Sequence, residues 1–370
     1  MTTIGIVGAG AAAAAATHVL DSAVPDADVT VLEKSGGLCG RAATRRNDDR
    51  DLVYDYGANY LKADDDRVVE LVTETLDDEG MVDAVEPVYT FDESGEVSPG
   101  RDADDHKWSY RRGLTQIAKR LFGGTDATVH RRTRVETIRR EDGNHEDGVN
   151  GGNGDERGDR SWTLVDTDGD SWGPFDVLLV NPPAPQTAEL LADAEWESPV
   201  RERLRAAAAD VPYRTVWTAV LHYPFALDRP YYGLVNADKE HPVGWISREE
   251  CKAGHVPDGE SLLVVQAGGE WSAERYDADP ADNVAELAGH AAEIVGDDRL
   301  LDPDWTDHQG WRYAIPEGEL DREPTPGEDP VDAAAREGLY VLGDWVAGEG
   351  RLHAALANGL DVGERVARGV

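Results

Sequence analysis

The feature that most constrains the fold is a glycine-rich turn close to the start of the sequence. The apolar run Ile4–Val7 precedes the turn and the run "AAAAAATHVL" follows it, which predicts a strand, a tight turn and a helix. Gly8 and Gly10 fill the first two places of the dinucleotide-binding fingerprint, and Ala13 fills the third, where alanine is tolerated. Gly8 makes the turn, Gly10 lets a pyrophosphate approach the backbone, and Ala13 lets the helix pack against the strand. The phosphates would then lie at the positive end of this helix.

A second predicted strand, "DVTVLEK", supports dinucleotide binding over a plain tight turn. It carries Glu33, which lies 23 residues after Gly10. This is about the spacing at which an acidic residue accepts hydrogen bonds from ribose hydroxyls. A carboxylate there favours an unphosphorylated ribose over one that carries a 2′-phosphate.

The segment after this strand indicates which dinucleotide is bound. "GGLCGRAATRR", followed by "YDYGANY", resembles the flavin-wrapping segment of the amine-oxidase superfamily, which NAD-only dehydrogenases lack. The resemblance implies FAD, with Arg41 near the pyrophosphate and with Asn59 and Tyr60 beside the isoalloxazine. FAD is expected to be non-covalent, because neither cysteine lies in a recognisable flavin-attachment motif.

Cys39 departs from the family pattern, because a glycine usually stands at this position. A Cβ atom makes a positive φ unfavourable, so we expect this loop to differ locally. A reactive thiol beside the flavin and a buried structural cysteine are both open, and the buried cysteine is favoured.

The C-terminal segment "GLYVLGDWVAGEGRLHAALANGL" predicts a strand that ends at Gly343-Asp344, a glycine-rich loop, and a helix from about Leu352. In the family it resembles, the Asp contacts the ribityl or phosphate region. The helix N-terminus there faces the flavin C2 carbonyl, where reduction places negative charge. His353 replaces a family Glu; it could tune the flavin or touch substrate, but a partly exposed helix-start histidine is the favoured interpretation.

The predicted fold class is α/β, with a discontinuous Rossmann-like FAD-binding domain of the GR2 type and an α+β substrate domain built on an antiparallel sheet. The FAD-binding domain is assigned to 1–80, 110–182 and 331–370, and the substrate domain to 81–109 and 183–330. Residues 141–160 are rich in acids and glycine and lack periodicity, so they predict a mobile loop rather than a metal site. No metal site is expected elsewhere.

The assigned substrate domain alternates strands, such as "YRTVWTAVLHY", "PVGWISRE" and "SLLVVQAG", with helices, one of which starts at Pro280. It also carries six of the ten tryptophans, of which two or three are expected to face the substrate and the rest to lie in the core. These six are Trp196, Trp217, Trp245, Trp271, Trp305 and Trp311.

Two stretches in this region, "HPVGWISREECKAG" and "DHQGWRYAIPEG", resemble the renalase-like flavoproteins, and the resemblance spans nearly the whole chain. It implies oxidation of dihydronicotinamide isomers, with hydride transfer to flavin N5 and reoxidation by dioxygen. The sequence has no second dinucleotide fingerprint, so a nicotinamide would enter the flavin pocket as a substrate. An amine oxidase or desaturase, with Lys252 as the candidate lysine near N5, and a flavin-binding protein without turnover remain alternatives.

Hydride transfer needs alignment more than a protein acid or base, so positioning residues are expected instead of a catalytic triad. The candidates are Tyr60, Trp245, Trp311, Arg312 and Tyr313, although Arg312 could equally form a structural ion pair. The candidate cofactor-binding residues are Gly8, Gly10, Ala11, Ala12, Glu33, Lys34, Gly40, Arg41, Ala58, Asn59, Tyr60, Gly343, Asp344, Arg351 and Leu352.

Composition bounds the partners and the environment. Asp and Glu outnumber Lys and Arg by 74 to 36, which disfavours nucleic acid and anionic lipid as partners. An apolar content of 40% argues against disorder, so we expect a folded acidic surface from a halophilic cytoplasm, with an unusually acidic protein from ordinary salt as the alternative. Neither a signal peptide nor a membrane span is expected, and the two cysteines are too few for a disulfide framework. The expected partner is a small-molecule substrate, and the expected state is a monomer or homodimer.

Overall fold

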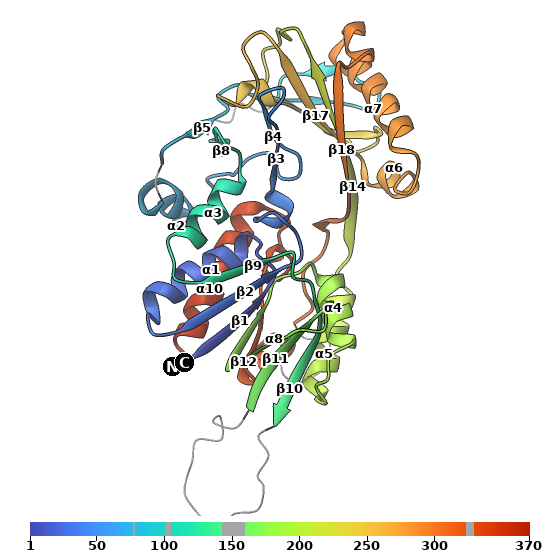
Figure 1. Cartoon of the computed structure of the whole chain (residues 1–370). Helices are drawn as coiled ribbons and strands as arrows, with labels where there is room; N and C mark the ends of the chain where they lie inside the picture. Colours follow the sequence, from blue (N-terminus) through green and yellow to red (C-terminus); the bar gives the residue numbers. More distant parts are fainter. Residues whose placement is uncertain (77, 101–104, 143–159, 323–328) are drawn as a thin grey trace, which may run out of the picture.

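The computed structural model describes residues 1–76, 78–100, 105–142, 160–322 and 329–370. Its first layer is a parallel sheet whose strands come from distant parts of the chain, as the discontinuous arrangement predicts (Figure 1). The order across this sheet is β19 (Leu339–Val341), β13 (Val177–Val180), β1 (Thr3–Val7), β2 (Asp28–Glu33) and β9 (Thr128–Arg131). All four pairings are parallel, so the strands end at one common edge.

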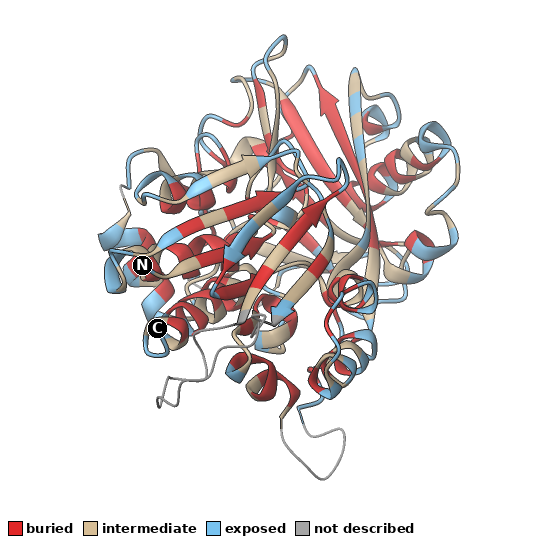
Figure 2. Cartoon of the chain, turned by 60° about the horizontal axis from the view of Figure 1, so that its bottom comes forward, coloured by how far each residue is buried: buried red, intermediate tan, exposed pale blue. Residues whose placement is uncertain are grey.

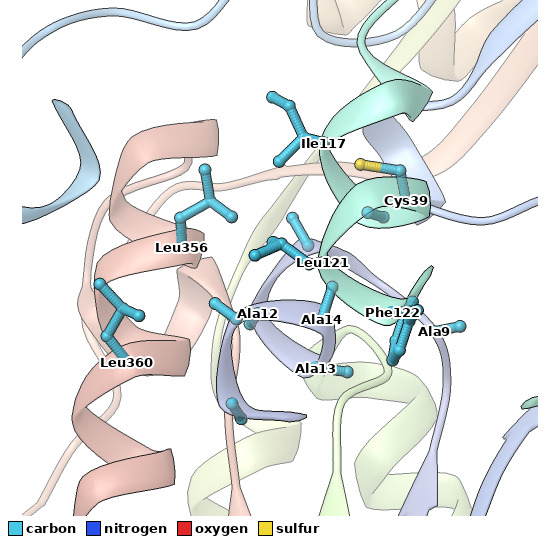
Figure 3. Close-up of a cluster of buried hydrophobic side chains, with 14 of the residues drawn as sticks. Ala9, Ala12, Ala13, Ala14, Cys39, Ile117, Leu121, Phe122, Leu356 and Leu360 are labelled. Atoms are coloured by element: carbon cyan, nitrogen blue, oxygen red, sulfur yellow. The ribbon is translucent and has the colours of Figure 1, made fainter. Parts of the chain in front are cut away.

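Three helices cover one face of the parallel sheet: α1 (Ala11–Ala23), α3 (Thr115–Gly123) and α10 (Leu352–Ala367). Figure 3 shows Leu356 and Leu360 of α10 facing the alanines of α1, with the α3 side chains beside them. Helices α1 and α10 approach closely, because a Cβ on Gly359 would lie 2.2 Å from the backbone oxygen of Ala12. The two chain ends therefore lie side by side in the same layer (Figure 1).

The other face carries an antiparallel sheet of β10 (Val135–Asp142), β11 (Arg160–Asp166) and β12 (Ser171–Phe175). The predicted strands on either side of residues 141–160 are confirmed as β10 and β11, whereas the mobile-loop prediction falls largely on 143–159, outside the described residues. The helices of this face are α4 (Ala184–Ala192), α5 (Pro199–Ala209) and α8 (Pro330–Arg336).

The packing of α4 and α5 differs from the predicted domain boundary. Both helices belong to the sequence range assigned to the substrate domain, but their apolar side chains share a core with β13 and β19. The reason is that the chain leaves the parallel sheet at Pro182 and Pro183, directly after β13. It then forms α4 and α5 against this sheet before it crosses to the second layer. The remaining domain boundaries stay predictions.

The second layer is a seven-stranded sheet with α6 (Gly269–Glu274) and α7 (Pro280–Val295) on its outer face (Figure 1). It is antiparallel as predicted, except that β6 pairs with β15 in parallel, because β6 comes from an earlier segment and not from a hairpin. The strand order is β18 (Trp305–Pro316), β14 (Tyr213–Tyr223), β17 (Ser261–Ala267), β16 (Val243–Arg248), β15 (Gly233–Asn236), β6 (Val88–Phe91) and β7 (Val97–Ser98).

Short elements connect the two layers. Figure 2 shows buried residues in the strands and the helices alike, while exposed residues mark the loops and parts of the helices. Among the described residues, no helix is both long and apolar enough to cross a bilayer. The connecting elements are β3 (Thr44–Asn47), β4 (Leu52–Asp55), α2 (Asp66–Glu70), β5 (Met81–Asp83), β8 (Trp108–Tyr110), α9 (Asp344–Ala347) and the single turns Gly40–Ala42, Leu71–Thr75, Glu249–Cys251 and Asp298–Leu301.

Candidate active site

A cleft of about 1810 Å³ lies between the carboxyl edge of the parallel sheet and the inner face of the seven-stranded sheet. Ligand pockets for drug-sized molecules are typically about 300–1,000 Å³, so this cleft has room for a dinucleotide together with a second ligand. Every residue that the sequence nominated for cofactor binding or substrate positioning lines it. The structure thus brings together segments from both ends and the middle of the chain, while the individual roles of these residues stay predictions.

The glycine turn and Glu33 form one end of the cleft. Gly8 has a φ of +90°, which is a conformation that favours glycine, and its N–H donates to the Leu32 carbonyl at 2.8 Å. The Glu33 carboxylate accepts hydrogen bonds from the N–H groups of Ala9 at 2.8 Å and Ser35 at 2.7 Å. Each carboxylate oxygen keeps further acceptor capacity for a ribose hydroxyl, so the local geometry is compatible with the predicted role.

Asn181, at the end of β13, is a cleft residue that the sequence analysis missed. Its Oδ1 accepts from the Gly10 N–H at 3.1 Å, and its Nδ2 donates to the Leu342 carbonyl at 3.1 Å. A Cβ on Gly10 would lie 2.4 Å from this Oδ1, so any other residue at position 10 would force Asn181 to move. The available signal was a polar residue at the carboxyl end of a buried strand, immediately before two prolines.

Arg41 and Asp344 form a bidentate ion pair across the cleft floor. The two guanidinium nitrogens lie 2.8 Å and 2.6 Å from the two carboxylate oxygens, and Arg41 also donates to the Ala314 carbonyl at 3.0 Å. The pair therefore ties the first segment of the chain to the last one and to β18. Both side chains line the cleft, where the resemblance placed the phosphate and ribityl contacts.

Cys39 takes the unfavourable backbone conformation that the sequence analysis considered, with a φ of 76°. Its side chain is buried against α3, and burial raises the pKa of its thiol to about 12. With this pKa the thiol is protonated at neutral pH. It is therefore a poor nucleophile, because the reactive form of cysteine is the thiolate. The structure supports the buried structural cysteine over the reactive thiol.

Two aromatic rings, Tyr60 and Trp245, line the sheet side of the cleft, and the buried ring of Tyr232 packs against both. Their ring centroids lie 5.9 Å, 6.2 Å and 6.2 Å apart in the three pairs. The Trp245 indole N–H is buried and has no hydrogen-bond acceptor among the described residues. A buried donor without an acceptor is unfavourable, so this N–H is suited to an acceptor on a bound ligand.

A set of amides holds the segment beside these rings in place. Asn59 donates from Nδ2 to Gln266 Oε1 at 3.2 Å, and Gln266 donates from Nε2 to the Gly57 carbonyl at 2.7 Å. Ser247 donates to Asn59 Oδ1 at 3.0 Å. Asn59 and Tyr60 thereby have fixed positions in the cleft wall, although the structure does not test their predicted contact with an isoalloxazine.

Trp311 forms the opposite part of the aromatic wall. Its ring stacks on the ring of Tyr56, with centroids 5.2 Å apart. The Arg45 guanidinium lies 4.3 Å from the centroid of the Tyr56 ring. Of the six tryptophans in question, Trp245 and Trp311 line the cleft, in agreement with the expectation of two or three. Trp196, Trp217 and Trp271 are buried in the cores.

Arg312 and Tyr313 follow Trp311 on β18. The Arg312 side chain is 55% exposed, lies 3.7 Å from Asp277 and stands 4.2 Å over the Tyr276 ring. Arg312 therefore forms the ion pair that was one alternative, and it also lines the cleft. Tyr313 packs edge-on against Tyr213, with centroids 5.9 Å apart.

The interpretation of His353 as partly exposed is wrong. The residue is 6% exposed, lines the cleft in the first turn of α10, and places Nε2 3.5 Å from the Glu349 carboxylate. The predicted helix start at Leu352 is confirmed, and the turn faces inward because α10 packs on α1 along its whole length.

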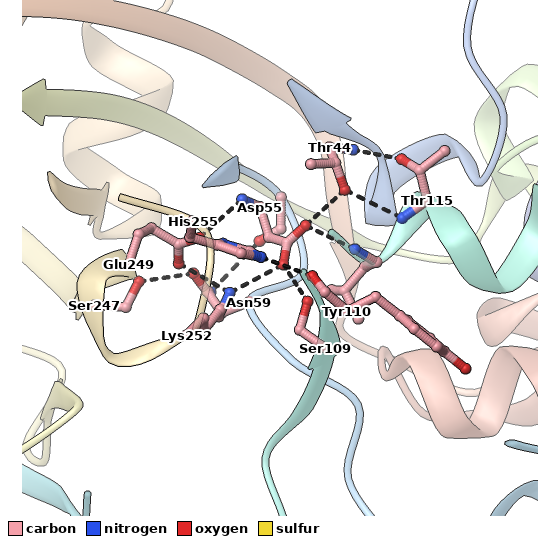
Figure 4. Close-up of polar contacts among 12 residues, drawn as sticks. Thr44, Asp55, Asn59, Ser109, Tyr110, Thr115, Ser247, Glu249, Lys252 and His255 are labelled. Atoms are coloured by element: carbon pink, nitrogen blue, oxygen red, sulfur yellow. Dashed lines mark hydrogen bonds and ion pairs between the residues drawn. The ribbon is translucent and has the colours of Figure 1, made fainter. Parts of the chain in front are cut away.

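Lys252 lies in a loop, as the polar sequence around it suggested, but its side chain is fully buried and does not line the cleft. Its Nζ lies 3.0 Å from Asp55 and 2.9 Å from Glu249, and His255 Nδ1 lies 2.8 Å from Glu249 (Figure 4). Burial alone would lower the pKa of Lys252, but the two carboxylates outweigh it and raise that pKa. We refer to Asp55, Glu249, Lys252 and His255 as the buried charge cluster.

The buried charge cluster also presents three groups that could ligate a metal, because atoms of Asp55, Glu249 and His255 lie within 4.8 Å of one another. The Lys252 ammonium already contacts both carboxylates, so the cluster holds its own cation. The arrangement is therefore explained without a metal ion.

Comparison with known proteins assigns the chain to a family. Residues 103–367 match the model of flavin-containing amine oxidoreductases, and residues 6–75 match that of NAD(P)-binding Rossmann-like domains. The chain belongs to the flavin-containing amine oxidoreductase family. It is therefore an FAD-dependent oxidoreductase, and the cleft fits FAD in its size, in its glycine turn at a helix N-terminus and in the unpaired Trp245 donor.

Solved structures similar to this family member show the same fold over the whole chain. A protein assigned provisionally as a protoporphyrinogen oxidase from Exiguobacterium sp. 255-15 is 14% identical, with a TM-score of 0.74 and coverage of 100% of this chain and 99% of that one. Reduced UDP-galactopyranose mutase is 11% identical, with a TM-score of 0.72 and coverage of 100% and 96%. Cyclohexylamine oxidase from Brevibacterium oxydans IH-35A is 13% identical, with a TM-score of 0.69 and coverage of 100% and 99%. These proteins differ in chemistry, so the likeness shows the fold and leaves the substrate open.

Proposed function

We propose that this FAD-dependent oxidoreductase is renalase-like and oxidises dihydronicotinamide isomers, with dioxygen as the final electron acceptor. FAD supplies the hydride acceptor when it is bound. The observation that carries the proposal is the wall of rings and amides around Trp245, Tyr60 and Gln266, which suits a flat heteroaromatic ring with an amide substituent.

The chain's own contribution in this proposal is positioning. Trp245 and Tyr60 hold the ring on one side and Trp311 holds it on the other, while Asn59 and Gln266 present amide groups of fixed orientation. Such alignment shortens the approach of donor and acceptor, and enclosure of the ring excludes water. The sheet-side lining between residues 213 and 316 contains no Asp or Glu among its described members, which agrees with a reaction that needs no carboxylate base.

An amine oxidase or desaturase remains the second candidate, because the family match is broader than the proposal. The expected lysine for that chemistry, Lys252, is held in the buried charge cluster and lies outside the cleft. This placement weighs against the alternative. A flavin-binding protein without turnover is the third candidate, and reduction of the bound flavin by any substrate excludes it.

The experiment is anaerobic mixing of the purified yellow protein with a panel of 2- and 6-dihydro-NAD(P) isomers and of simple amines, followed at the visible flavin bands. We expect the isomers to bleach the flavin, and air to restore the colour with formation of peroxide. Trp311→Ala should slow reduction about fivefold or more without emptying the FAD site, because an aromatic contact is worth about 1 kcal/mol beyond the area it buries.

Trp305→Ala is the matched control, since Trp305 lies on the same strand but does not line the cleft. Its rate of flavin reduction should equal that of the wild type. Bleaching by amines but not by the isomers would reject the proposal in favour of an amine oxidase.

We also propose a halophilic cytoplasmic origin. The support is compositional: the charge is −38, and only six of the basic residues are lysines. A surface rich in carboxylates and poor in lysine stays solvated in concentrated salt.

A further inference from the structure

The sheet side of the cleft carries a charge opposite to that of the chain. Asp and Glu outnumber Lys and Arg by 74 to 36 overall. The described cleft-lining residues between 213 and 316 nevertheless include Arg214, Lys239 and Arg312, together with His241, and no acidic residue. We call Arg214, Lys239 and Arg312 the cationic rim. A local reversal of sign in so acidic a protein indicates selection for a negatively charged ligand.

Arg214 lies on β14 opposite Ile315 of β18, and Arg312 lies three positions before Ile315 on β18. They lie beside the bulge where β14 pairs with β18, and Thr215 Oγ1 donates to the Arg312 carbonyl at 3.1 Å. The Arg214 side chain packs over Gly269, where an added Cβ would come within 2.9 Å of it. Arg214 and Arg312 thus lie on paired strands, and both line the cleft.

The existing partners of these two arginines do not close the rim to a ligand. Arg214 lies 2.5 Å from Glu317, and Arg312 lies 3.7 Å from Asp277, but neither carboxylate lines the cleft. All four side chains are more than a third exposed, and exposed ion pairs contribute little stability. A phosphate that enters from the cleft can therefore compete for the guanidinium groups, which bind phosphate with two hydrogen bonds each.

Lys239 extends the rim past the aromatic wall. It follows β15, is exposed, and forms no ion pair with any described residue. Lys239, Arg214 and Trp245 all line the same cleft. The cationic rim thus borders the same wall that carries Trp245.

We propose that the cationic rim is an anion-binding subsite that holds the phosphate groups of the substrate while its redox-active ring lies at Trp245. The proposal deepens the function proposed above and rests on it for the placement of the ring. It names the substrate class as phosphate-bearing, and it disfavours protonated amines, which the rim would repel.

The test uses the holoenzyme at one constant ionic strength, because salt screens such contacts. Flavin reduction is measured with a 6-dihydronicotinamide dinucleotide and with the uncharged riboside that carries the same ring. In Arg214→Gln/Lys239→Gln, KM for the dinucleotide should rise at least about tenfold, as expected for loss of charge-assisted hydrogen bonds, while kcat and the riboside kinetics stay unchanged. Arg312→Gln should raise KM for the dinucleotide in the same direction. Arg299→Gln is the matched control, because Arg299 is an exposed arginine paired with Asp297 outside the cleft.

Calorimetric titration with inorganic pyrophosphate separates the two proposals. If the dinucleotide reduces the flavin but its KM is unchanged in the double variant, the anion subsite is overturned and the proposed function stands. If neither nicotinamide compound reduces the flavin, the proposed function fails. Pyrophosphate binding that is present in the wild type and lost in the double variant then still supports the subsite, whereas equal binding or no binding to both proteins overturns it.

Discussion

Lys252→Met is the substitution whose consequence follows most directly from the structure. Lys252 is fully buried, and its ammonium contacts Asp55 at 3.0 Å and Glu249 at 2.9 Å. Burial alone would raise the pKa of Asp55, but the charges of Lys252 and His255 and the hydrogen bonds to this carboxylate hold that pKa below its ordinary value. Methionine keeps the unbranched shape of lysine and removes the charge, so the variant isolates the ion pairs from the packing.

The expected loss of stability can be derived from the proton that the variant must bind. Without the ammonium, one buried carboxylate is left uncompensated and becomes protonated. Protonation at pH 7 of a carboxyl group with an ordinary pKa of about 3.9 costs roughly 4 kcal/mol, at about 1.4 kcal/mol for each pH unit. This value lies within the range of about 3–5 kcal/mol that is typical when one partner of a buried ion pair is removed.

The assay is equilibrium denaturation of the holoenzyme in molar KCl between pH 5 and pH 7. In the variant the folded-state pKa of the carboxyl is raised above its unfolded value, so the destabilisation is largest at pH 7. It should shrink by about 1.4 kcal/mol for each unit that the pH falls toward 5. In the wild type the pKa of Asp55 is lowered, so Asp55 stays ionised between pH 5 and pH 7. It therefore adds no pH dependence to the free energy of unfolding in this range. Lys119→Met, which removes an exposed lysine, is the control.

Two results would refute this reasoning. A loss below about 1 kcal/mol at pH 7 would mean that water or rearrangement replaces the ammonium, as happens at exposed ion pairs. A loss of about 4 kcal/mol that does not change with pH would mean that packing, and not charge, accounts for it. The variant should also keep its rate of flavin reduction per bound FAD, because Lys252 lies outside the cleft.

Three further predictions concern cofactor, packing and salt. Gly10→Val should lower FAD occupancy, measured as the flavin-to-protein absorbance ratio, because the new Cβ would lie 2.4 Å from Asn181 Oδ1; full occupancy would contradict the site. Gly359→Val should destabilise the fold by several kcal/mol in denaturation experiments, because its Cβ would lie 2.2 Å from the Ala12 carbonyl oxygen; an unchanged midpoint would contradict the close helix approach. The thermal midpoint should rise from 10 mM to molar KCl as carboxylate repulsion is screened; an unchanged midpoint would reject the halophilic origin.

The sequence was most informative where local chemistry determines structure. The glycine turn, the two flanking strands and the helix from Leu352 each carry their own signal, and all are confirmed. Glycine positions and apolar periodicity act within a few residues, so no tertiary information is needed to interpret them. The same applies to the long strand Tyr213–Tyr223, whose predicted bounds are those of β14.

The features that the sequence did not reveal depend on partners distant in the chain. Lys252 stands in a polar stretch, and its burial depends on pairing with Asp55, 197 positions away, together with Glu249 on its own loop. His353 is buried because α10 packs on α1, and Asn181 matters because the sheet places it over Gly10. The burial of Lys252 could not be inferred from its local sequence, because a paired ionic group can be buried where an isolated one cannot.

The position of the Arg41–Asp344 pair has a consequence for biosynthesis. The cleft floor joins residues 303 positions apart, so it does not exist until the last part of the chain has left the ribosome. Domains generally fold as units and from the N-terminal side during synthesis, but here the first glycine turn must wait for α10 to cover it. A chain interrupted before Asp344 would have no cofactor site to complete. Acquisition of yellow colour therefore reports, in one step, that synthesis has passed Asp344 and that the segments carrying Arg41 and Asp344 have come together.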